Sequence, residues 1–268
     1  MKQKVLAVVD ILLYLIIYLC MQGLCMGIFS AFFKSDMGMA LTLTQVVSAT
    51  VTIAIFYVMH WSPLLDTFYC RKPALFYSAL IILTLASIIP SQWFIELSEA
   101  DVPKEFEALF KALFEEPIGL FAIAVLVPIC EEVVFRGAIL GRLLKVFGTK
   151  KAWGAIIISA LIFGLAHGNL AQSPHAFALG ILFGWLYYRT DSLIPSAIMH
   201  VLNNSTAVLM ECMMPDKDTD KLIDIFNGNS QLMYISIAAS IAIAIPALWV
   251  LIKNTPPASP QPSPKERE

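Results

Sequence analysis

The chain has 268 residues, of which 58% are hydrophobic and 14% are charged, and its mean hydropathy is +0.75. A soluble domain usually carries about 25% charged residues, so this chain has too much apolar surface for one water-soluble core and is expected to be an integral membrane protein. A formal net charge of −2 argues against a basic nucleic-acid-binding face, so we expect no nucleic acid partner.

Eight segments are predicted to cross the membrane as helices, because a spanning helix needs roughly 20 mostly apolar residues. They lie at about 5–31, 44–60, 74–92, 117–146, 152–168, 174–189, 193–211 and 231–252. The first is too long for the apolar part of a signal peptide, about 7–15 residues, and is expected to remain as an anchor. The sequence therefore predicts an all-α fold, a polytopic transmembrane helical bundle of about eight spans with the site inside the bundle.

Residues 1–253 are expected to form one integral membrane domain, with a motif-bearing core at about 115–210. The tail at 254–268 is rich in proline and serine and is predicted to be a disordered cytoplasmic segment. An acidic stretch at 96–116 has apolar residues at helical spacing, which suggests an amphipathic helix at the outer membrane interface, with a solvated loop as the alternative. Three G-x-x-x-G pairs are interpreted as helix contacts: Gly23–Gly27, Gly137–Gly141 and Gly180–Gly184.

Lysine and arginine residues near the span ends predict the orientation, because cytoplasmic loops are enriched in them. They cluster at Lys2 and Lys4, at Arg71 and Lys72, from Arg142 to Lys151, at Arg189 and at Lys253. With eight spans, all these clusters fall on one side. We therefore expect a multi-pass protein of the cytoplasmic (inner) membrane with both termini in the cytoplasm.

Three charged residues fall inside the fourth span, in the stretch VPICEEVVFRG at 127–137. An unpaired charge at mid-bilayer costs about 2.5–3.5 kcal/mol on insertion scales, so three would cost roughly 8–10 kcal/mol. Glu132 and Arg136 are four residues apart, share one helix face and can pair. Glu131 points about 100° away from Glu132 and stays free to face another group. Pro128, just before the carboxylates, is expected to kink the helix and to free a backbone carbonyl.

Two further polar pairs lie on later spans. LIFGLAHGN places Phe163 and His167 four residues apart on one face, and LIPSAIMHVLNNST does the same with His200 and Asn204. Glu131 and His167 are each about 18 residues from the turn between their helices, so both lie roughly 27 Å along them, at a similar depth. The depth of His200, counted from its own turn, matches less well.

The motifs E-E-x-x-x-R, F-x-x-x-H and H-x-x-x-N on successive apolar segments resemble those of the CPBP family, the CAAX prenyl proteases and bacteriocin-processing enzymes, also called the Abi family. Here they read EEVVFR, FGLAH and HVLNN, and the resemblance covers roughly residues 115–210. It implies a protease, an intramembrane endopeptidase with its site sunk in a helical bundle.

By this resemblance, four residues would be catalytic. Glu131 and His167 would activate a water molecule, while His200 and Asn204 would stabilise the oxyanion formed on the scissile carbonyl. The supporting residues would be Glu132, Arg136 and Phe163.

The same side chains allow a second mechanism, in which Glu131, His167 and His200 hold Zn²⁺ and leave one position for water. The sequence contains no H-E-x-x-H pattern. We therefore expect no cofactor and favour water activated by glutamate, with zinc as the alternative.

Two other function classes fit the same residues. A transporter or ion-relay protein could use the Glu/His cluster to carry protons or cations, although the sequence shows no internal repeat. A non-catalytic immunity or scaffold membrane protein is the third possibility. The expected partners are membrane lipids and a peptide or protein substrate, with lipidated and membrane-embedded substrates included.

Overall fold

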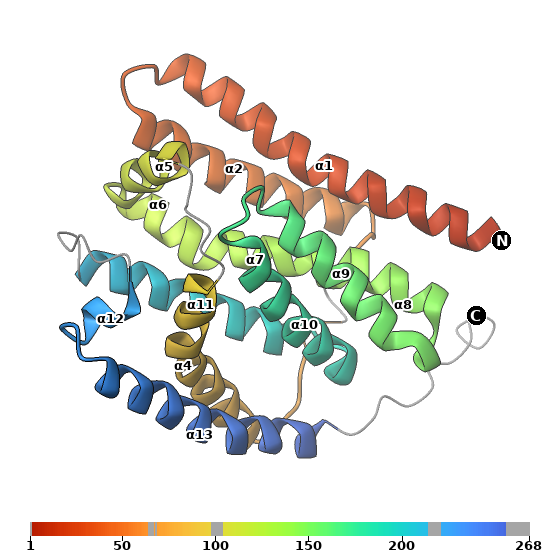
Figure 1. Ribbon diagram of the computed structural model, residues 1–268. Coiled ribbons are helices and arrows are strands. Elements are labelled where there is room, and N and C mark those ends of the chain that lie inside the picture. The colour runs from red at the N-terminus through yellow and green to blue at the C-terminus, as the bar shows by residue number, and fades with distance from the viewer. Residues whose placement is uncertain (1, 64–66, 68, 98–103, 214–220, 256–268) are drawn as a thin grey trace.

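The computed structural model describes residues 2–63, 67, 69–97, 104–213 and 221–255 (Figure 1). Every regular element in these ranges is a helix, as the apolar composition predicts. The tail that was expected to be disordered lies outside the described residues from position 256 onward.

The long helices are α1 (Lys2–Phe32), α2 (Met37–Val58), α4 (Ala74–Glu96), α9 (Ala152–Ala166), α10 (Ser173–Thr190), α11 (Ile194–Met213) and α13 (Ser230–Asn254). A continuous rod at 117–147 consists of α6 (Pro117–Phe121), η1 (Ala122–Leu126), α7 (Val127–Glu131), η2 (Glu132–Leu140) and α8 (Gly141–Phe147). Within this rod, η1 and η2 are π-helical. The short elements are α5 (Lys104–Phe114), η3 (Thr149–Lys151) and α12 (Leu222–Ile225).

Six helices in the described part of the chain are long and apolar enough to cross a membrane. They are Val5–Phe32, Met37–Val58, Ala74–Glu96, Pro117–Phe147, Thr149–Ala166 and Ser230–Asn254. The other two expected spans are α10 and α11, which have 18 and 20 residues and are long enough but less apolar. The prediction of a polytopic helical membrane protein is confirmed, with six strongly apolar spans where eight were expected. α11 is less apolar because it carries polar side chains of the candidate site, His200 and Asn204.

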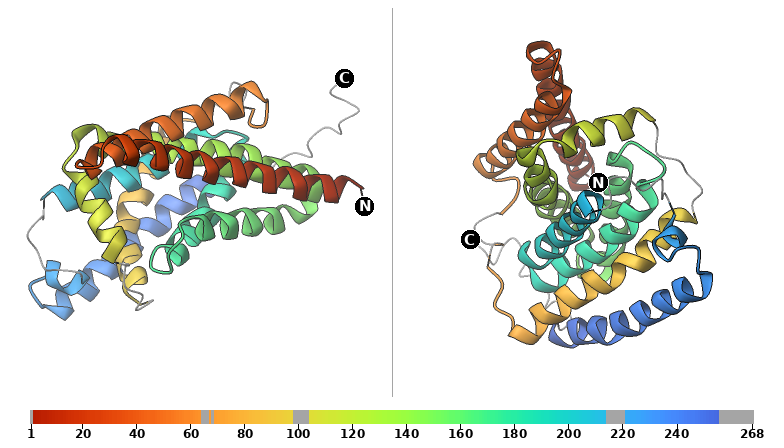
Figure 2. Two further views of the ribbon diagram at one scale, coloured as in Figure 1. Left: turned by 90° about the horizontal axis from the view of Figure 1, so that it is seen from above. Right: turned by 90° about the vertical axis from the view of Figure 1, so that its left-hand side faces the viewer.

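The helices pack as pairs around the central rod. α1 packs along α2, α9 along α10, and α4 along α13. The α1–α2 pair and the α4–α13 pair lie on opposite sides of the molecule, with the motif-bearing helices between them (Figures 1 and 2). The largest buried apolar cluster surrounds the rod and includes side chains of α1, α2 and α9. The rod that carries Glu131 is therefore the centre of the fold.

The glycine pairs differ in what they contact. At Gly180 of α10, an added Cβ would lie 3.0 Å from the Cβ of Ala160, and at Gly184 it would lie 3.2 Å from Cγ2 of Ile156. These glycines let α9 and α10 approach closely, as predicted. An added Cβ at Gly23 or Gly27 would meet nothing within 4 Å, so the prediction of a helix contact is wrong for that pair.

Candidate functional site

The centre of the site is an ion pair within η2. Nη1 of Arg136 lies 2.9 Å from Oε1 of Glu132, and both side chains are 1% exposed. The Arg136 guanidinium carbon also lies 4.2 Å from the ring centroid of Phe163 and 5.1 Å from that of Phe183. Opposite charge and two aromatic faces offset the loss of water around a fully buried guanidinium. The pairing predicted from the four-residue spacing is confirmed.

His200 connects this ion pair to Glu131. Its Nδ1 lies 2.9 Å from Oε1 of Glu132, and its Nε2 lies 3.4 Å from Oε2 of Glu131. Depth counted from the helix turns favoured His167 as the neighbour of Glu131, whereas the structure brings His200 there. Counting assumes parallel helices, but α11 and α10 are not parallel (Figure 1).

Glu131 has a second partner that the sequence did not predict. The Tyr18 hydroxyl of α1 donates a hydrogen bond to Oε1 of Glu131 at 3.1 Å, and the carboxylate is 13% exposed. One signal was available in the otherwise apolar first span. Its polar and aromatic residues recur every four positions, which places them on one helix face. These residues are Asp10, Tyr14, Tyr18 and Gln22.

His167 lies beside the cluster at the end of α9. Its ring is edge-on to that of Phe163, with centroids 4.9 Å apart, and the Phe163 ring is in turn 5.8 Å from that of His200. Nδ1 of His167 lies 2.9 Å from the Phe163 carbonyl oxygen. This contact leaves Nε2 of His167 available for another partner. Within the described residues, His167 forms no hydrogen bond or ion pair with Glu131.

Asn204 lies one helical turn after His200, and its side chain bonds to a backbone carbonyl of the rod. That carbonyl has no helical donor, because Pro128 has no N–H. The N–H of Val127 bonds to the carbonyl of Ala122, five residues back, so the Ile123 carbonyl would need an N–H from Pro128, which has none. Nδ2 of Asn204 donates to that Ile123 oxygen at 3.3 Å. The prediction that Pro128 frees a carbonyl is confirmed, and the bond ties α11 to the rod.

A further histidine, His175, lies in the first turn of α10. It is close enough to His167 and His200 to interact electrostatically. Its Nε2 is buried and has no hydrogen-bond partner among the described residues. The sequence signal that could have placed it here is its position two residues into α10, directly after the loop that follows His167.

The described residues contain no group of three His, Cys, Asp or Glu side chains that could hold a metal ion. The zinc alternative requires Glu131, His167 and His200 to converge, and only Glu131 and His200 are in contact. The arrangement therefore gives the zinc mechanism no support.

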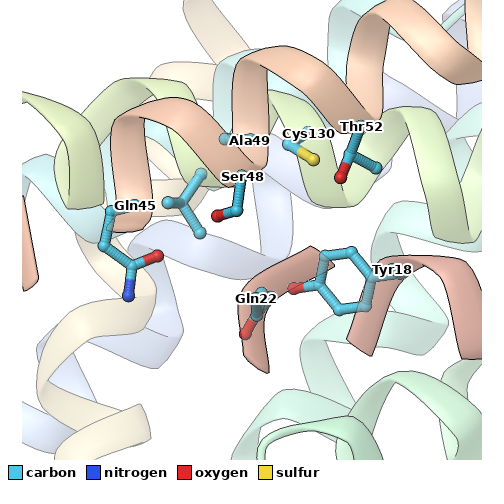
Figure 3. Close-up of a pocket in the computed structure, with 8 residues that line it drawn as sticks. Tyr18, Gln22, Gln45, Ser48, Ala49, Thr52 and Cys130 are labelled. Atoms are coloured by element: carbon cyan, nitrogen blue, oxygen red, sulfur yellow. The ribbon is translucent and has the colours of Figure 1, made fainter. Parts of the chain in front are cut away.

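A small polar pocket lies next to Glu131, between α1, α2 and α7 (Figure 3). Its space is about that of one water molecule. The lining residues are Tyr18, Gln22, Gln45, Ser48, Ala49, Thr52, Val127 and Cys130. The Tyr18 hydroxyl, which bonds to Glu131, faces this pocket.

Comparisons with known proteins match the central third of the chain. Residues 113–206 match the family described as type II CAAX prenyl endopeptidase Rce1-like. The chain is 33% identical over 103 residues to the membrane-embedded CAAX protease MroQ of Staphylococcus aureus (strain USA300), which covers 37% of this chain and 42% of the relative. It is 29% identical over 105 residues to "Putative membrane peptidase YdiL" of Bacillus subtilis (strain 168), which covers 39% of this chain and 42% of the relative.

The chain thus spans less than half the length of these two relatives. No solved structure matches it. The matched segment contains every candidate site residue predicted from the sequence, from Glu131 to Asn204. Residues 113–206 of this chain are thus similar to the Rce1-like type II CAAX prenyl endopeptidase family, the CPBP or Abi family.

Proposed function

We propose that this protein is an intramembrane endopeptidase that hydrolyses a peptide bond with a water molecule activated by Glu131. The observation that carries the proposal is the buried series Glu131, His200, Glu132 and Arg136, in which neighbouring polar atoms lie 2.9 to 3.4 Å apart. Intramembrane ionisable groups are rare and mark functional sites. The family of residues 113–206 and the names of both relatives support the same reaction class.

In the proposed reaction, the Glu131 carboxylate takes a proton from water, and the water oxygen attacks the scissile carbonyl carbon. The carbonyl electron pair moves to its oxygen, which forms the oxyanion of a tetrahedral intermediate. Collapse of this intermediate breaks the C–N bond, and the proton on Glu131 passes to the leaving amine. The Phe163 carbonyl contacts Nδ1 of His167, so Nε2 is available. This Nε2 is proposed to hold the attacking water together with Glu131.

His200 and Asn204 are the proposed donors to the oxyanion. Glu132 accepts from Nδ1 of His200 and so fixes the ring. Nε2 of His200 is the proposed donor to the oxyanion in the form of the ring that carries a proton on both nitrogens. Asn204 uses one amide N–H for the Ile123 carbonyl, and its second N–H remains for the substrate. Arg136 and Phe163 are the proposed supports of this arrangement.

The proposed substrate is a peptide or a membrane-embedded protein. The family description and the name of MroQ make a C-terminal CAAX peptide with a prenylated cysteine the first class to test. The same peptides without the prenyl group would show whether the lipid is required.

The test is cleavage of such a peptide library by purified protein in detergent. Wild-type protein is expected to cleave, and Glu131→Gln is expected to lower kcat roughly 100- to 10,000-fold, the usual contribution of a general base. Glu211→Gln, an exposed position at the end of α11, is the matched control and should retain activity.

Three outcomes would contradict the proposal. Equal cleavage by wild type and Glu131→Gln would remove Glu131 from the reaction. Loss of wild-type activity with a strong zinc chelator would favour the metal mechanism. No cleavage of any peptide, with ion flux that changes in Glu131→Gln, would favour the ion relay.

A further inference from the structure

We infer that α1 completes the site and that Tyr18 is a positioning residue, which fixes the Glu131 carboxylate for its reaction with water. This inference rests on the proposed function and adds a residue outside the matched segment 113–206. It assigns a role in the reaction to the N-terminal helix.

The first support is the contact itself. The Tyr18 hydroxyl donates to Oε1 of Glu131 at 3.1 Å, while Oε2 of Glu131 faces Nε2 of His200 at 3.4 Å. Each carboxylate oxygen therefore has its own neighbour, and the plane of the carboxylate is fixed. Tyr18 is only 5% exposed, and its ring packs edge-on against Phe135 of η2 with centroids 5.5 Å apart. The donor is as well fixed as the acceptor.

The second support is that α1 is held in register by contacts with the rod and with the end of α2 at other points on the same face. Nε of Arg142 on α8 lies 2.7 Å from Oδ2 of Asp10. One turn later, the Tyr14 ring packs against Trp61 and Phe56, with centroids 5.0 and 5.7 Å away. Because these contacts and Tyr18 are four residues apart, they fix both the rotation and the height of α1.

The third support is the polar pocket behind Tyr18 (Figure 3). The hydroxyls of Thr44 and Thr50 on α2 donate to carbonyl oxygens four residues back, at 2.8 and 2.7 Å. The hydroxyls of Ser48 and Thr52 line the pocket instead and form no hydrogen bond with another described group. A water molecule held there would donate to the Tyr18 oxygen, which leaves the phenol proton directed at Glu131.

The test compares Tyr18→Phe with Tyr14→Phe, because each change removes one hydroxyl from the same buried face of α1. The Tyr14 hydroxyl forms no hydrogen bond within the described residues, so Tyr14→Phe should keep the wild-type kcat and KM. Loss of a hydrogen bond to a charged group should lower kcat of Tyr18→Phe about 10- to 100-fold. KM and the melting temperature of Tyr18→Phe should stay at wild-type values. If Tyr18 were merely structural, its loss would lower the melting temperature.

A second readout does not need catalysis. Dicyclohexylcarbodiimide labels carboxyl groups inside membranes, and mass spectrometry gives the rate at which Glu131 is labelled. Tyr18→Phe frees Oε1 and should speed this labelling several-fold, while Tyr14→Phe should match the wild type. Glu131→Gln supplies the background.

The outcomes separate the two proposals. If wild type cleaves, Glu131→Gln does not, and Tyr18→Phe keeps the wild-type kcat, the inference about Tyr18 is overturned and the proposed function stands. If wild type cleaves nothing, the proposed function and the role of Tyr18 in it both fail. Equal labelling rates in Tyr18→Phe and wild type would overturn the positioning of Glu131 by Tyr18 in either case.

Discussion

At the scale of single residues, His200 joins two carboxylates with different surroundings. Its Nδ1 faces Glu132, which also holds Arg136, and its Nε2 faces Glu131. Glu132 is 1% exposed and is paired with the Arg136 guanidinium. Glu131 is 13% exposed and accepts a hydrogen bond from the neutral Tyr18 hydroxyl. Two adjacent residues of the same type therefore have different surroundings, which is consistent with the proposed supporting role of Glu132 and the proposed catalytic role of Glu131.

The Glu132–Arg136 pair gives a prediction about stability. Arg136→Met leaves a buried carboxylate without its partner and should lower the free energy of unfolding by about 3–5 kcal/mol. Glu132→Gln combined with Arg136→Met removes both charges and should recover most of that loss. Activity should stay low in both variants. In each of them His200 loses the Glu132 carboxylate that is paired with Arg136 and holds its ring.

The measurement is denaturant unfolding in detergent. Arg142→Met is the matched control, because its ion pair with Asp10 is 27% and 35% exposed and such a pair is worth about 0–1 kcal/mol. A double variant no more stable than Arg136→Met would contradict the explanation by an unpaired charge.

At the scale of elements, the rod and α11 are joined where the rod's own hydrogen bonding is interrupted. Because of Pro128 and the π-helical turns, the Ile123 carbonyl accepts a hydrogen bond from Asn204 instead of from the rod's backbone. The Ser205 hydroxyl lies 3.4 Å from the Ala124 carbonyl oxygen. A local defect in one helix thus fixes the position of a second helix, and with it His200.

Asn204 is consequently expected to have two separable roles, one in folding and one in the reaction. Asn204→Leu should lower the free energy of unfolding by about 1–3 kcal/mol, because the part-buried Ile123 carbonyl loses its donor. In a Pro128→Ala background the backbone supplies an N–H, so Asn204→Leu should destabilise the protein less. The activity loss should be the same in both backgrounds if Asn204 also binds the oxyanion.

A double-mutant cycle of unfolding free energies measures this coupling. Additive stability effects of the two changes would contradict the proposed hydrogen-bond exchange, and a return of activity in the double variant would restrict Asn204 to a structural role.

How much the sequence could predict follows from the range of the interactions. The Glu132–Arg136 pair and the carbonyl freed by Pro128 depend on spacing within one helix, so both were predictable. The contact between His200 and Glu131 depends on the angle between α11 and its neighbours, which no count along a helix supplies. The partner of Tyr18 lies 113 positions away in the chain. The polar stripe on α1 indicates that this face contacts other polar groups, but it does not identify the residues that it contacts.

At the scale of the whole molecule, the topology depends on whether α10 and α11 cross the membrane. We predict that they do, as a pair, which gives eight crossings and places both termini and the α10–α11 turn in the cytoplasm. Single cysteines in a cysteine-free background test this with a membrane-impermeant thiol reagent. Lys4→Cys, Lys253→Cys and Asp191→Cys should react only when the cytoplasmic face is open.

Lys34→Cys, in the turn between α1 and α2, is the control and should react from the outer face. Labelling of Asp191→Cys from the outer face would show that α10 and α11 do not cross, while the six apolar spans keep the two termini on the same side.

The shortness of the contact between His200 and Glu131 also has an electrical consequence. A proton exchanged between these groups moves 3.4 Å at most, against a hydrocarbon thickness of about 30 Å. Moving one charge across the whole membrane takes about 2.3 kcal/mol per 100 mV, so this step responds to 100 mV with about 0.3 kcal/mol or less. A proton transfer between His200 and Glu131 would therefore be nearly independent of the membrane voltage.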